Sequence, residues 1–322
     1  MTNAKEFKTI DEQISLLKSR NLKFNDENIA RLRLKKYNYF DIINGTENIL
    51  LKSTIPKSYD DVYFEDFFEI YNFDTKLRVL TLRKIFDVEA RLKTSISYNF
   101  ASLFCRNLAN TLNYTERQYY QTPDESDSYL HSTFMTFDLF KRNTRMPNGT
   151  TRLGFVERKR NEKDYIKKYN KPPFWVMIKD FSFGELYFTY CFQKDVVKEK
   201  ILDDFNLSLS DDKLFQQILH TMKYARNCCA HLELITRFKL LGIAELNNYR
   251  ELKVFIDCHH KHLSYYDLLK ILAKFCDVSE ISKAITDFHR GMYLNNRTAI
   301  ANKLLKRMGE QDIDRWQIIT RK

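Results

Sequence analysis

Three residues suited to acid–base and phosphate chemistry lie close together, at Arg226, Asn227 and His231. Cleaving RNA without a metal ion requires a base for the 2′-hydroxyl proton, a cation for the pentacoordinate phosphate and a group that places the scissile phosphate. Histidine, arginine and asparagine suit these three tasks. The spacing alone is weak evidence, because an arginine shortly before a histidine arises by chance about once in such a chain.

These residues fall on an expected helix with an apolar stripe of Leu214, Ile218, Met222, Ala225, Cys229 and Leu232. Asn227 and His231 share a face, whereas Arg226 and His231 differ by roughly 140° around the helix. One straight helix therefore does not assemble the set. Either the helix bends near Cys228 and Cys229, or the Arg226 side chain wraps around, or a second copy of the motif completes the site, which predicts a two-fold homodimer.

The composition predicts an all-α protein. The chain has 322 residues, of which 43% are hydrophobic, with only 7 glycines and 5 prolines and no proline after Pro173. This scarcity of breakers favours long helices over β-hairpins. A capping box at Thr9–Glu12 begins a helix to about Arg20, another starts near Asn25, and an apolar-periodic run covers residues 64–104. Further helices are expected at 265–276 and 300–308.

The charge balance limits the partners. Basic residues exceed acidic ones by 53 to 42, a formal charge of +11, so a polyanion is the natural partner, either nucleic acid or an anionic membrane. No segment has the roughly 20 apolar residues that span a bilayer, and no export signal precedes the chain, so we expect a cytoplasmic protein that makes no membrane contact. The six cysteines are then expected to be reduced, mostly buried thiols.

Neither a metal nor another cofactor is expected. No Cys-x-x-Cys pair and no glycine-rich phosphate loop occur. The run His259-His260-Lys261-His262 lacks a second ligand pair, so a solvated helix start is the better interpretation. His220, on the motif helix, is interpreted as ordinary interface or surface polarity.

Two charged residues, Arg78 and Glu89, lie on the apolar stripe of the 64–104 run. A buried Glu89 would need compensation. A structural ion pair with Arg78 or Arg91 is favoured over a role beside the active site, in which Glu89 and Arg78 would support the catalytic residues.

The stretch 141–171 is an expected exposed, partly irregular insertion with eleven basic and three acidic residues. Such clustering suits phosphate binding, and Phe155, Tyr165 and Tyr169 would offer stacking faces. A merely solvated surface is the alternative. The candidate RNA-binding residues are Lys141, Arg142, Arg145, Arg152, Arg158, Lys159, Arg160, Lys163, Lys167 and Lys168.

Several ordered segments resemble the Abi family of bacterial abortive-infection proteins, of the AbiD and AbiF type. The resemblance covers roughly residues 5–240 and rests on segments 7–20, 71–78, 88–92, 174–177, 181–184 and 226–231. One departure is Leu234, where many relatives carry a basic residue; Arg237 is a substitute.

The resemblance implies the HEPN superfamily: a helical bundle, here with additional helices and the basic insertion, over residues 1–240, with 241–322 as a C-terminal helical extension packed on it. It also implies a homodimer whose paired motifs form a metal-independent endoribonuclease, with Arg226 and His231 catalytic and Asn227 orienting. The family further implies phage defence by growth arrest, in some members as a toxin restrained by a structured non-coding RNA, which residues 141–171 would bind.

Two alternatives stay open. HEPN folds are also used for binding alone, so the chain could be a non-catalytic RNA-binding protein in which Arg226 and His231 only contact phosphate. A growth-arrest effector acting through a protein partner or on a membrane is the other, against which the clustered charge and the missing membrane segment count.

Overall fold

The computed structural model describes residues 6–240, 249–258 and 262–319, and these are predominantly α-helical, as the composition predicts. The described residues form two compact units: residues 6–84, 225–240 and 262–319 make up unit 1, and residues 85–224 and 249–258 make up unit 2. The first unit thus joins the C-terminal helices to the N-terminal residues. The division falls within two continuous helices, α4 and α11.

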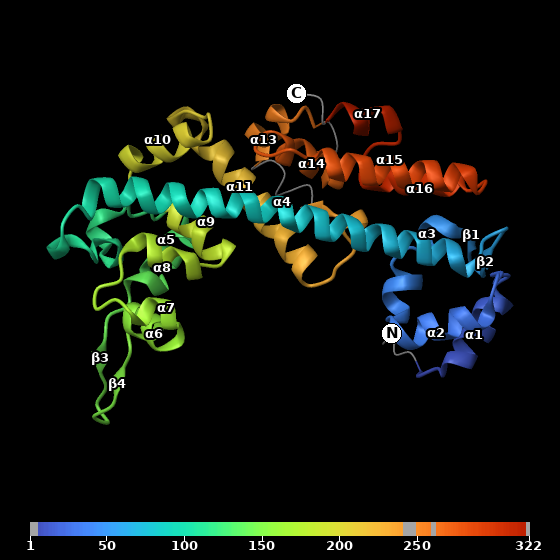
Figure 1. The fold of residues 1–322 in the computed structure, drawn as a ribbon, viewed down its shortest axis with the longest axis horizontal. Coiled ribbons are helices and arrows are strands. Elements are labelled where there is room, and N and C mark those ends of the chain that lie inside the picture. The colour runs from blue at the N-terminus through green and yellow to red at the C-terminus, as the bar shows by residue number, and fades with distance from the viewer. Residues whose placement is uncertain (1–5, 241–248, 259–261, 320–322) are drawn as a thin grey trace. The chain divides into compact units, whose positions relative to one another are not determined.

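Helix α4 is the longest element. It runs unbroken from Phe64–Phe104, 41 residues, at the bounds that the apolar periodicity predicts (Figure 1). At 1.5 Å per residue it is about 60 Å long. Its first part contributes Phe73 and Leu77 to the core of unit 1, and its last part contributes Ile96 and Phe100 to the core of unit 2.

Unit 1 begins with the predicted capping box, in which Thr9 and Glu12 satisfy each other's backbone N–H groups at the start of α1. Ser264 and Asp267 do the same for α14. Besides parts of α4 and α11, its elements are α1 (Ile10–Ser19), α2 (Glu27–Lys36), the π-helical turn Phe40–Asn44, α3 (Glu47–Leu50), β1 (Leu51–Thr54), β2 (Lys57–Tyr59), the 3-10 turn Ile235–Arg237, β5 (Lys239–Leu240), β6 (Leu263–Ser264), α14 (Tyr265–Ala273), α15 (Ser279–Leu294), α16 (Thr298–Met308) and α17 (Ile313–Ile318).

The C-terminal helices of unit 1 pack on the first part of α4. Phe73 stacks on Phe288 of α15 with ring centroids 4.0 Å apart. The hydroxyl groups of Thr81 and Tyr265 share a hydrogen bond of 2.8 Å, and Trp316 is fully buried against Tyr265. The predicted helices at 265–276 and 300–308 are thus confirmed as α14 and α16, and both contribute buried residues to unit 1.

Unit 2 is organised around an aromatic core. Tyr114 stacks on Phe174 at 4.8 Å, and Phe134 packs edge-on against Phe192 at 5.1 Å. Besides parts of α4 and α11, its elements are the 3-10 turns Leu108–Asn110, Asn113–Thr115, Arg117–Tyr119, Asp138–Phe140, Ile178–Asp180 and Leu209–Asp211, and α5 (Ser128–Thr136), β3 (Thr144–Arg145), β4 (Thr151–Arg152), α6 (Phe155–Glu162), α7 (Asp164–Lys167), α8 (Phe174–Met177), α9 (Phe183–Cys191), α10 (Asp195–Asp204) and α13 (Arg250–Phe255).

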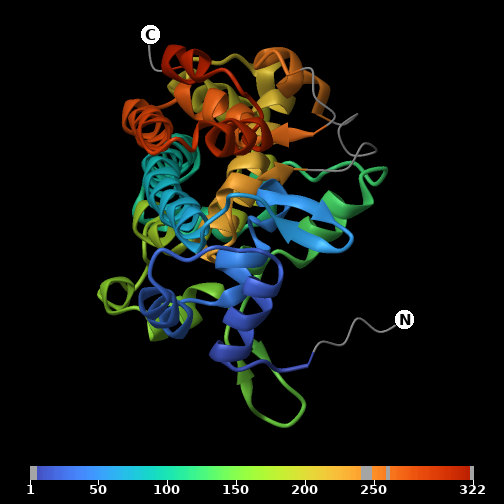
Figure 2. The same cartoon turned by 90° about the vertical axis from the view of Figure 1, so that its right-hand side faces the viewer.

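Short β-ribbons are the part of the fold that the composition argument did not predict. Strands β1 and β2 pair antiparallel in unit 1 (Figure 2), as do β5 and β6, and β3 and β4 form a hairpin in unit 2 that extends beyond α6 and α7 (Figure 1). Each strand has two to four residues. Such short pairs need only a few extended residues, so they form even in a sequence whose composition favours helices.

Candidate active site at the end of helix α11

Arg226 and Asn227 lie in the last turn of α11 (Asp212–Ala230), and His231 follows its last residue directly. Its apolar stripe is buried as predicted at Leu214, Ile218, Met222, Ala225 and Cys229. The backbone N–H of His231 donates to the carbonyl of Asn227 at 2.9 Å, so helical geometry continues through Cys228 and Cys229. The structure therefore has no bend there, which removes the first of the three ways of assembling the motif.

Helix α11 ends in a Schellman motif directly after the histidine. The N–H of Leu232 donates to the carbonyl of Cys229 at 3.3 Å, and that of Glu233 donates to Cys228 at 2.9 Å. Leu232 adopts a left-handed conformation with φ of 61°, which costs a non-glycine residue about 1 kcal/mol. Its side chain is 68% exposed, so the prediction that Leu232 extends the buried stripe is wrong: the helix ends before it.

The three motif side chains lie at this helix end and make few hydrogen bonds or ion pairs. Asn227 and His231 are exposed and Arg226 is half-buried. An Nη1–H of Arg226 donates to Oδ1 of Asn227 over 3.4 Å, a long contact by which the arginine reaches toward the Asn227 face. Its Nε is buried and makes no hydrogen bond, and within the described residues neither Arg226 nor His231 makes an ion pair. The exposed imidazole of His231 and the guanidinium of Arg226 therefore carry no counter-charge from the described residues.

A buried polar network fixes the segment that follows the motif. Oδ1 of Asp74, fully buried, accepts hydrogen bonds from the backbone N–H and the hydroxyl of Thr236, both at 2.8 Å. Oδ2 of Asp74 lies 2.9 Å from Nε of Arg78. Arg307 donates to the Thr236 hydroxyl at 3.0 Å and to the carbonyl of Gly45 at 3.1 Å. Thr236 is thus held from two sides, five residues after His231.

Burial shapes the protonation of this network. It raises the pKa of the Asp74 carboxyl, a rise that the Thr236 donors and the Arg78 charge oppose. It lowers the pKa of Arg307 to about 10, and the neighbouring charge of Arg237 acts in the same direction. It also raises the pKa of the Cys229 thiol to about 12, so this cysteine is no thiolate nucleophile at neutral pH.

Gly45 and Leu234 make a close contact beside the motif. A Cβ on Gly45 would lie 2.1 Å from Cδ1 of Leu234 and 2.7 Å from the carbonyl oxygen of Asp41. Glycine is needed here for this close approach and not for its backbone angles, because its φ is −62°. The departure at Leu234 thus has a packing reason, and exposed Arg237 stays the candidate for the missing basic residue.

The structure resolves the question of Arg78 and Glu89. Arg78 is 5% exposed and pairs with Asp74, so it belongs to the network that holds Thr236. Glu89 pairs with Lys93 at 2.8 Å, so the predicted pairing with Arg78 or Arg91 is wrong. One helical turn of α4 separates each of the two from its actual partner, which makes both pairs local contacts. Sequence reasoning missed Asp74, although its i,i+4 spacing to Arg78 was a usable signal.

The basic insertion divides into paired and unpaired cations. Six of its candidate residues form ion pairs: Lys141 and Arg158 with Asp138, Arg142 with Glu116, Lys159 and Lys163 with Asp180, and Arg160 with Glu157. The other four are exposed and have no ion pair within the described residues: Arg145, Arg152, Lys167 and Lys168. The insertion is exposed and partly irregular, as predicted, but fewer charges are available than its composition suggests.

The β3–β4 hairpin carries two of these four cations. Its register pairs Thr144 with Arg152 and Arg145 with Thr151. Because cross-strand partners share a face and successive residues alternate, the two arginines point to opposite faces of the hairpin. Of the three aromatics proposed for stacking, Tyr165 and Tyr169 are exposed, whereas Phe155 is 1% exposed and anchors α6 in the core.

His220 has a more specific environment than surface polarity. Its Nδ1 shares a short hydrogen bond with the hydroxyl of Tyr249, and its ring packs edge-on against Tyr187. Burial lowers its pKa to about 4, and the charge of Lys223 adds to this shift. His220 is therefore a neutral, packed histidine at physiological pH.

No group of histidine, cysteine, aspartate or glutamate in the described residues is arranged to hold a metal ion. His259, His260 and Lys261 lie outside those residues. No described helix combines the length and the apolar character that crossing a membrane requires. Four of the six cysteines are buried, at positions 191, 228, 229 and 258.

The family model of Abi-like proteins matches residues 33–235, more than half of the chain, and the chain belongs to this family. The matched range contains the motif, Asp74 and the basic insertion, and all of the resembling segments except 7–20. No significant match was found among curated proteins or among solved structures. Membership of the family places the chain in abortive-infection defence against phage.

Proposed function

We propose that this protein is a defence toxin that cleaves RNA without a metal ion, through Arg226, Asn227 and His231 of two chains. The observation that carries the proposal is the state of these side chains. All three lie at the end of α11: Asn227 and His231 are exposed, and the half-buried Arg226 makes no ion pair and contacts Asn227 over a long 3.4 Å. In a chain with many ion-paired cations, an arginine and a histidine without a counter-charge are suited to an anionic substrate.

The reaction assigns one task to each side chain. The imidazole of His231 takes the proton of a ribose 2′-hydroxyl, the 2′-oxygen bonds to the adjacent phosphorus, and the bond from phosphorus to the 5′-oxygen breaks. The products are a 2′,3′-cyclic phosphate and a 5′-hydroxyl end. Arg226 stabilises the charge of the pentacoordinate phosphate, and Asn227 orients Arg226 or the phosphate.

The chemistry itself favours a dimer. The leaving 5′-oxygen needs a proton, so the reaction uses an acid as well as a base. The motif supplies one histidine per chain. A second His231 across a two-fold axis would provide the other role, in agreement with the wide angle between Arg226 and His231 on one straight helix.

A structured non-coding RNA is proposed as the restraint on the toxin, held by the unpaired cations of the basic insertion. Neutralising Arg145, Arg152, Lys167 and Lys168 together should lower the slope of log affinity against log salt by up to about 3, since each phosphate contact contributes about 0.7 to 0.9. Arg142→Gln, which removes an ion-paired charge, is the matched control and should change the slope little. Equal slopes in all variants would place the RNA elsewhere.

The decisive experiment compares wild type with His231→Ala and Arg226→Ala on total RNA in the presence of EDTA. Both variants should lose cleavage and keep most of their stability, because His231 is exposed and Arg226 makes no ion pair within the described residues. His289→Ala and Arg290→Ala on α15 are the matched controls and should cleave normally. Full cleavage by both motif variants would refute the assignment.

The same preparations test the two other candidate functions. RNA that co-purifies with wild type but is never cut would favour a binding protein, in which Arg226 and His231 only grip phosphate. Growth arrest without bound or cleaved RNA would favour action through a protein partner. The dimer is tested by sedimentation, and specific activity should rise with protein concentration through the dissociation range.

A further inference from the structure

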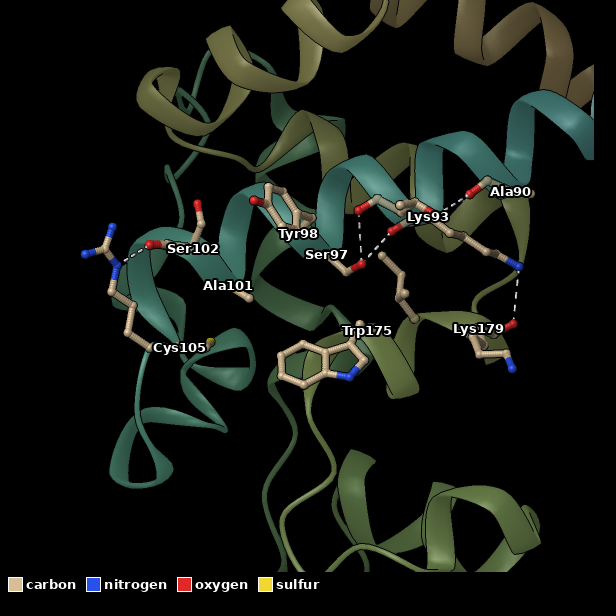
Figure 3. Close-up of a pocket in the computed structure, with 12 residues that line it drawn as sticks. Ala90, Lys93, Ser97, Tyr98, Ala101, Ser102, Cys105, Trp175 and Lys179 are labelled. Carbon is tan, nitrogen blue, oxygen red and sulfur yellow. Dashed lines mark hydrogen bonds between the residues drawn. The ribbon is translucent and has the colours of Figure 1, made fainter.

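A groove in unit 2 carries a second, independent set of unengaged side chains. It has a volume of about 930 Å³ and runs along α4 from Ala90 to Ser102 and on to Cys105 and Arg106 after its end, facing α8 and the turn after it. At 1.5 Å per residue this part of α4 measures about 20 Å. Figure 3 shows Ser97, Tyr98 and Ala101 on α4 and the indole of Trp175 opposite them.

The two aromatic side chains of the groove are unusually open to solvent. Tyr98 is 70% exposed and Trp175 is 56% exposed. Trp175 is displayed because its neighbours Phe174 and Met177 are buried and fix α8 in the aromatic core. Large exposed aromatic side chains beside a groove are typical of binding surfaces, because covering them removes a large apolar area from water.

The charge of the groove has a single sign. Its lining includes Lys93, Arg106 and Lys179 and no aspartate or glutamate. Lys93 is paired with Glu89, whereas Arg106 and Lys179 have no ion pair within the described part of the chain. Burial raises the pKa of the Cys105 thiol to about 11, so the groove holds no thiolate nucleophile at neutral pH. Flat apolar faces beside cations suit a ligand with flat apolar rings and phosphate groups.

The groove leads toward the basic insertion. The ammonium of Lys179 lies 5.4 Å from the ring centre of exposed Tyr165 on α7. The unpaired Lys167 and Lys168 follow directly in the sequence. Aromatic faces and free cations therefore alternate from Trp175 through Lys179 and Tyr165, which is the pattern of surfaces that bind single strands.

We infer that this groove binds unstacked nucleotides of single-stranded RNA, with a base stacked on Trp175 or Tyr98 and phosphates near Arg106 and Lys179. The inference rests on the proposed function only in taking RNA as the ligand. It adds a capture site on unit 2 that is separate from the motif residues on unit 1. Half-buried Ser102, whose hydroxyl donates to the carbonyl of Asn99, keeps acceptor lone pairs for a base N–H group.

The two tryptophans of the chain allow a direct test. Trp316 is fully buried, so an oligonucleotide that stacks on Trp175 should quench mainly the emission of Trp175. The probe is a short 2′-O-methyl oligouridylate, which lacks the attacking hydroxyl and stays intact with wild-type protein. We expect saturable quenching in wild type and its loss in Trp175→Phe, where the unchanged emission of Trp316 reports an intact fold.

Affinity measurements with variants complete the test. Tyr98→Ala should weaken binding about tenfold, the usual effect of losing one stacking face. Tyr293→Ala removes a tyrosine of similar exposure from α15 and should leave the affinity unchanged. The inference would be overturned by equal quenching in Trp175→Phe, by equal quenching with duplex RNA, or by the absence of saturable binding. A dimer that dissociates on Trp175→Ala while no oligonucleotide binds would also overturn it, because the groove would then be an interface between copies of the chain.

This outcome is distinguishable from that of the proposed function. Quenching without any cleavage of natural RNA would leave the groove assignment standing and remove the ribonuclease. Cleavage that depends on His231, together with unquenched Trp175 emission, would remove the groove assignment alone.

Discussion

Replacing Asp74 by alanine is the most informative perturbation of the support beneath the motif. The Asp74 carboxylate is fully buried, accepts two hydrogen bonds from Thr236 and neutralises Arg78, which is itself 5% exposed. Alanine would leave the Arg78 guanidinium buried without a counter-charge and the Thr236 N–H without an acceptor. Both are among the few changes that cost several kcal/mol.

The expected loss follows from these contacts. Removing one partner of a buried ion pair costs about 3–5 kcal/mol, and an unsatisfied buried N–H costs about 1–3 kcal/mol, with partial overlap between the two. We therefore expect Asp74→Ala to lower the free energy of unfolding by about 4 kcal/mol, a large part of the usual 5–15 kcal/mol. Asp74→Asn keeps an acceptor for Thr236 and should cost about half as much.

The assay is urea unfolding at neutral pH, with Glu69→Ala as control because Glu69 is an exposed acid on the same helix. The control should change stability by less than about 0.5 kcal/mol. Arg78→Met in the Asp74→Ala background removes the stranded charge and should restore at least about 1 kcal/mol. An Asp74→Ala protein within about 1 kcal/mol of wild type, with no rescue by Arg78→Met, would refute the account of this network.

Three further changes have calculable effects. Gly45→Ala should lower the free energy of unfolding by about 1–3 kcal/mol in thermal unfolding and disturb the segment after the motif, because its Cβ would overlap Leu234 and the Asp41 carbonyl. Unchanged stability would contradict the close approach. Leu232→Gly should stabilise by about 1 kcal/mol in urea, because it relieves the left-handed strain and loses little buried area. Burial lowers the pKa of His220 to about 4, so the unfolded chain binds the proton first and stability should fall as pH drops from about 6.5 toward 4. After allowance for solvent the loss is about 1–2 kcal/mol, and His220→Gln should abolish this part of the pH dependence measured by unfolding.

The parts of the fold that the sequence predicted are those encoded locally. The capping box at Thr9, the full extent of α4 and the helices after residue 264 depend on caps and periodicity within a few turns. The end of α11 was misplaced because Leu232 continues the apolar period while its backbone leaves the helix. Short ribbons such as β3–β4 have too few residues to show a period.

The support of the candidate site could not be predicted, because it joins residues far apart in the chain. Asp74 and Thr236 are 162 positions apart, and Thr236 and Arg307 are 71 apart. The motif itself is local and was found from its residue types. The pairing of Lys159 and Lys163 with Asp180 likewise depends on how the chain returns past α6, so composition overstated the free charge of the insertion.

The proposed cleavage site and the proposed capture site lie on different units. Arg226, His231 and the Asp74 network belong to unit 1, whereas Trp175, Tyr98 and the free cations of the insertion belong to unit 2. Residues with no common partner usually contribute additively to binding and stability. Substitutions in the groove should therefore change RNA affinity and leave the cleavage step of bound RNA intact, and substitutions in the motif should do the reverse. If the effects of the two sets of substitutions on the cleavage rate are not additive, one strand of RNA engages both sites at once. Cleavage rates of single and combined variants therefore decide how capture and chemistry are connected.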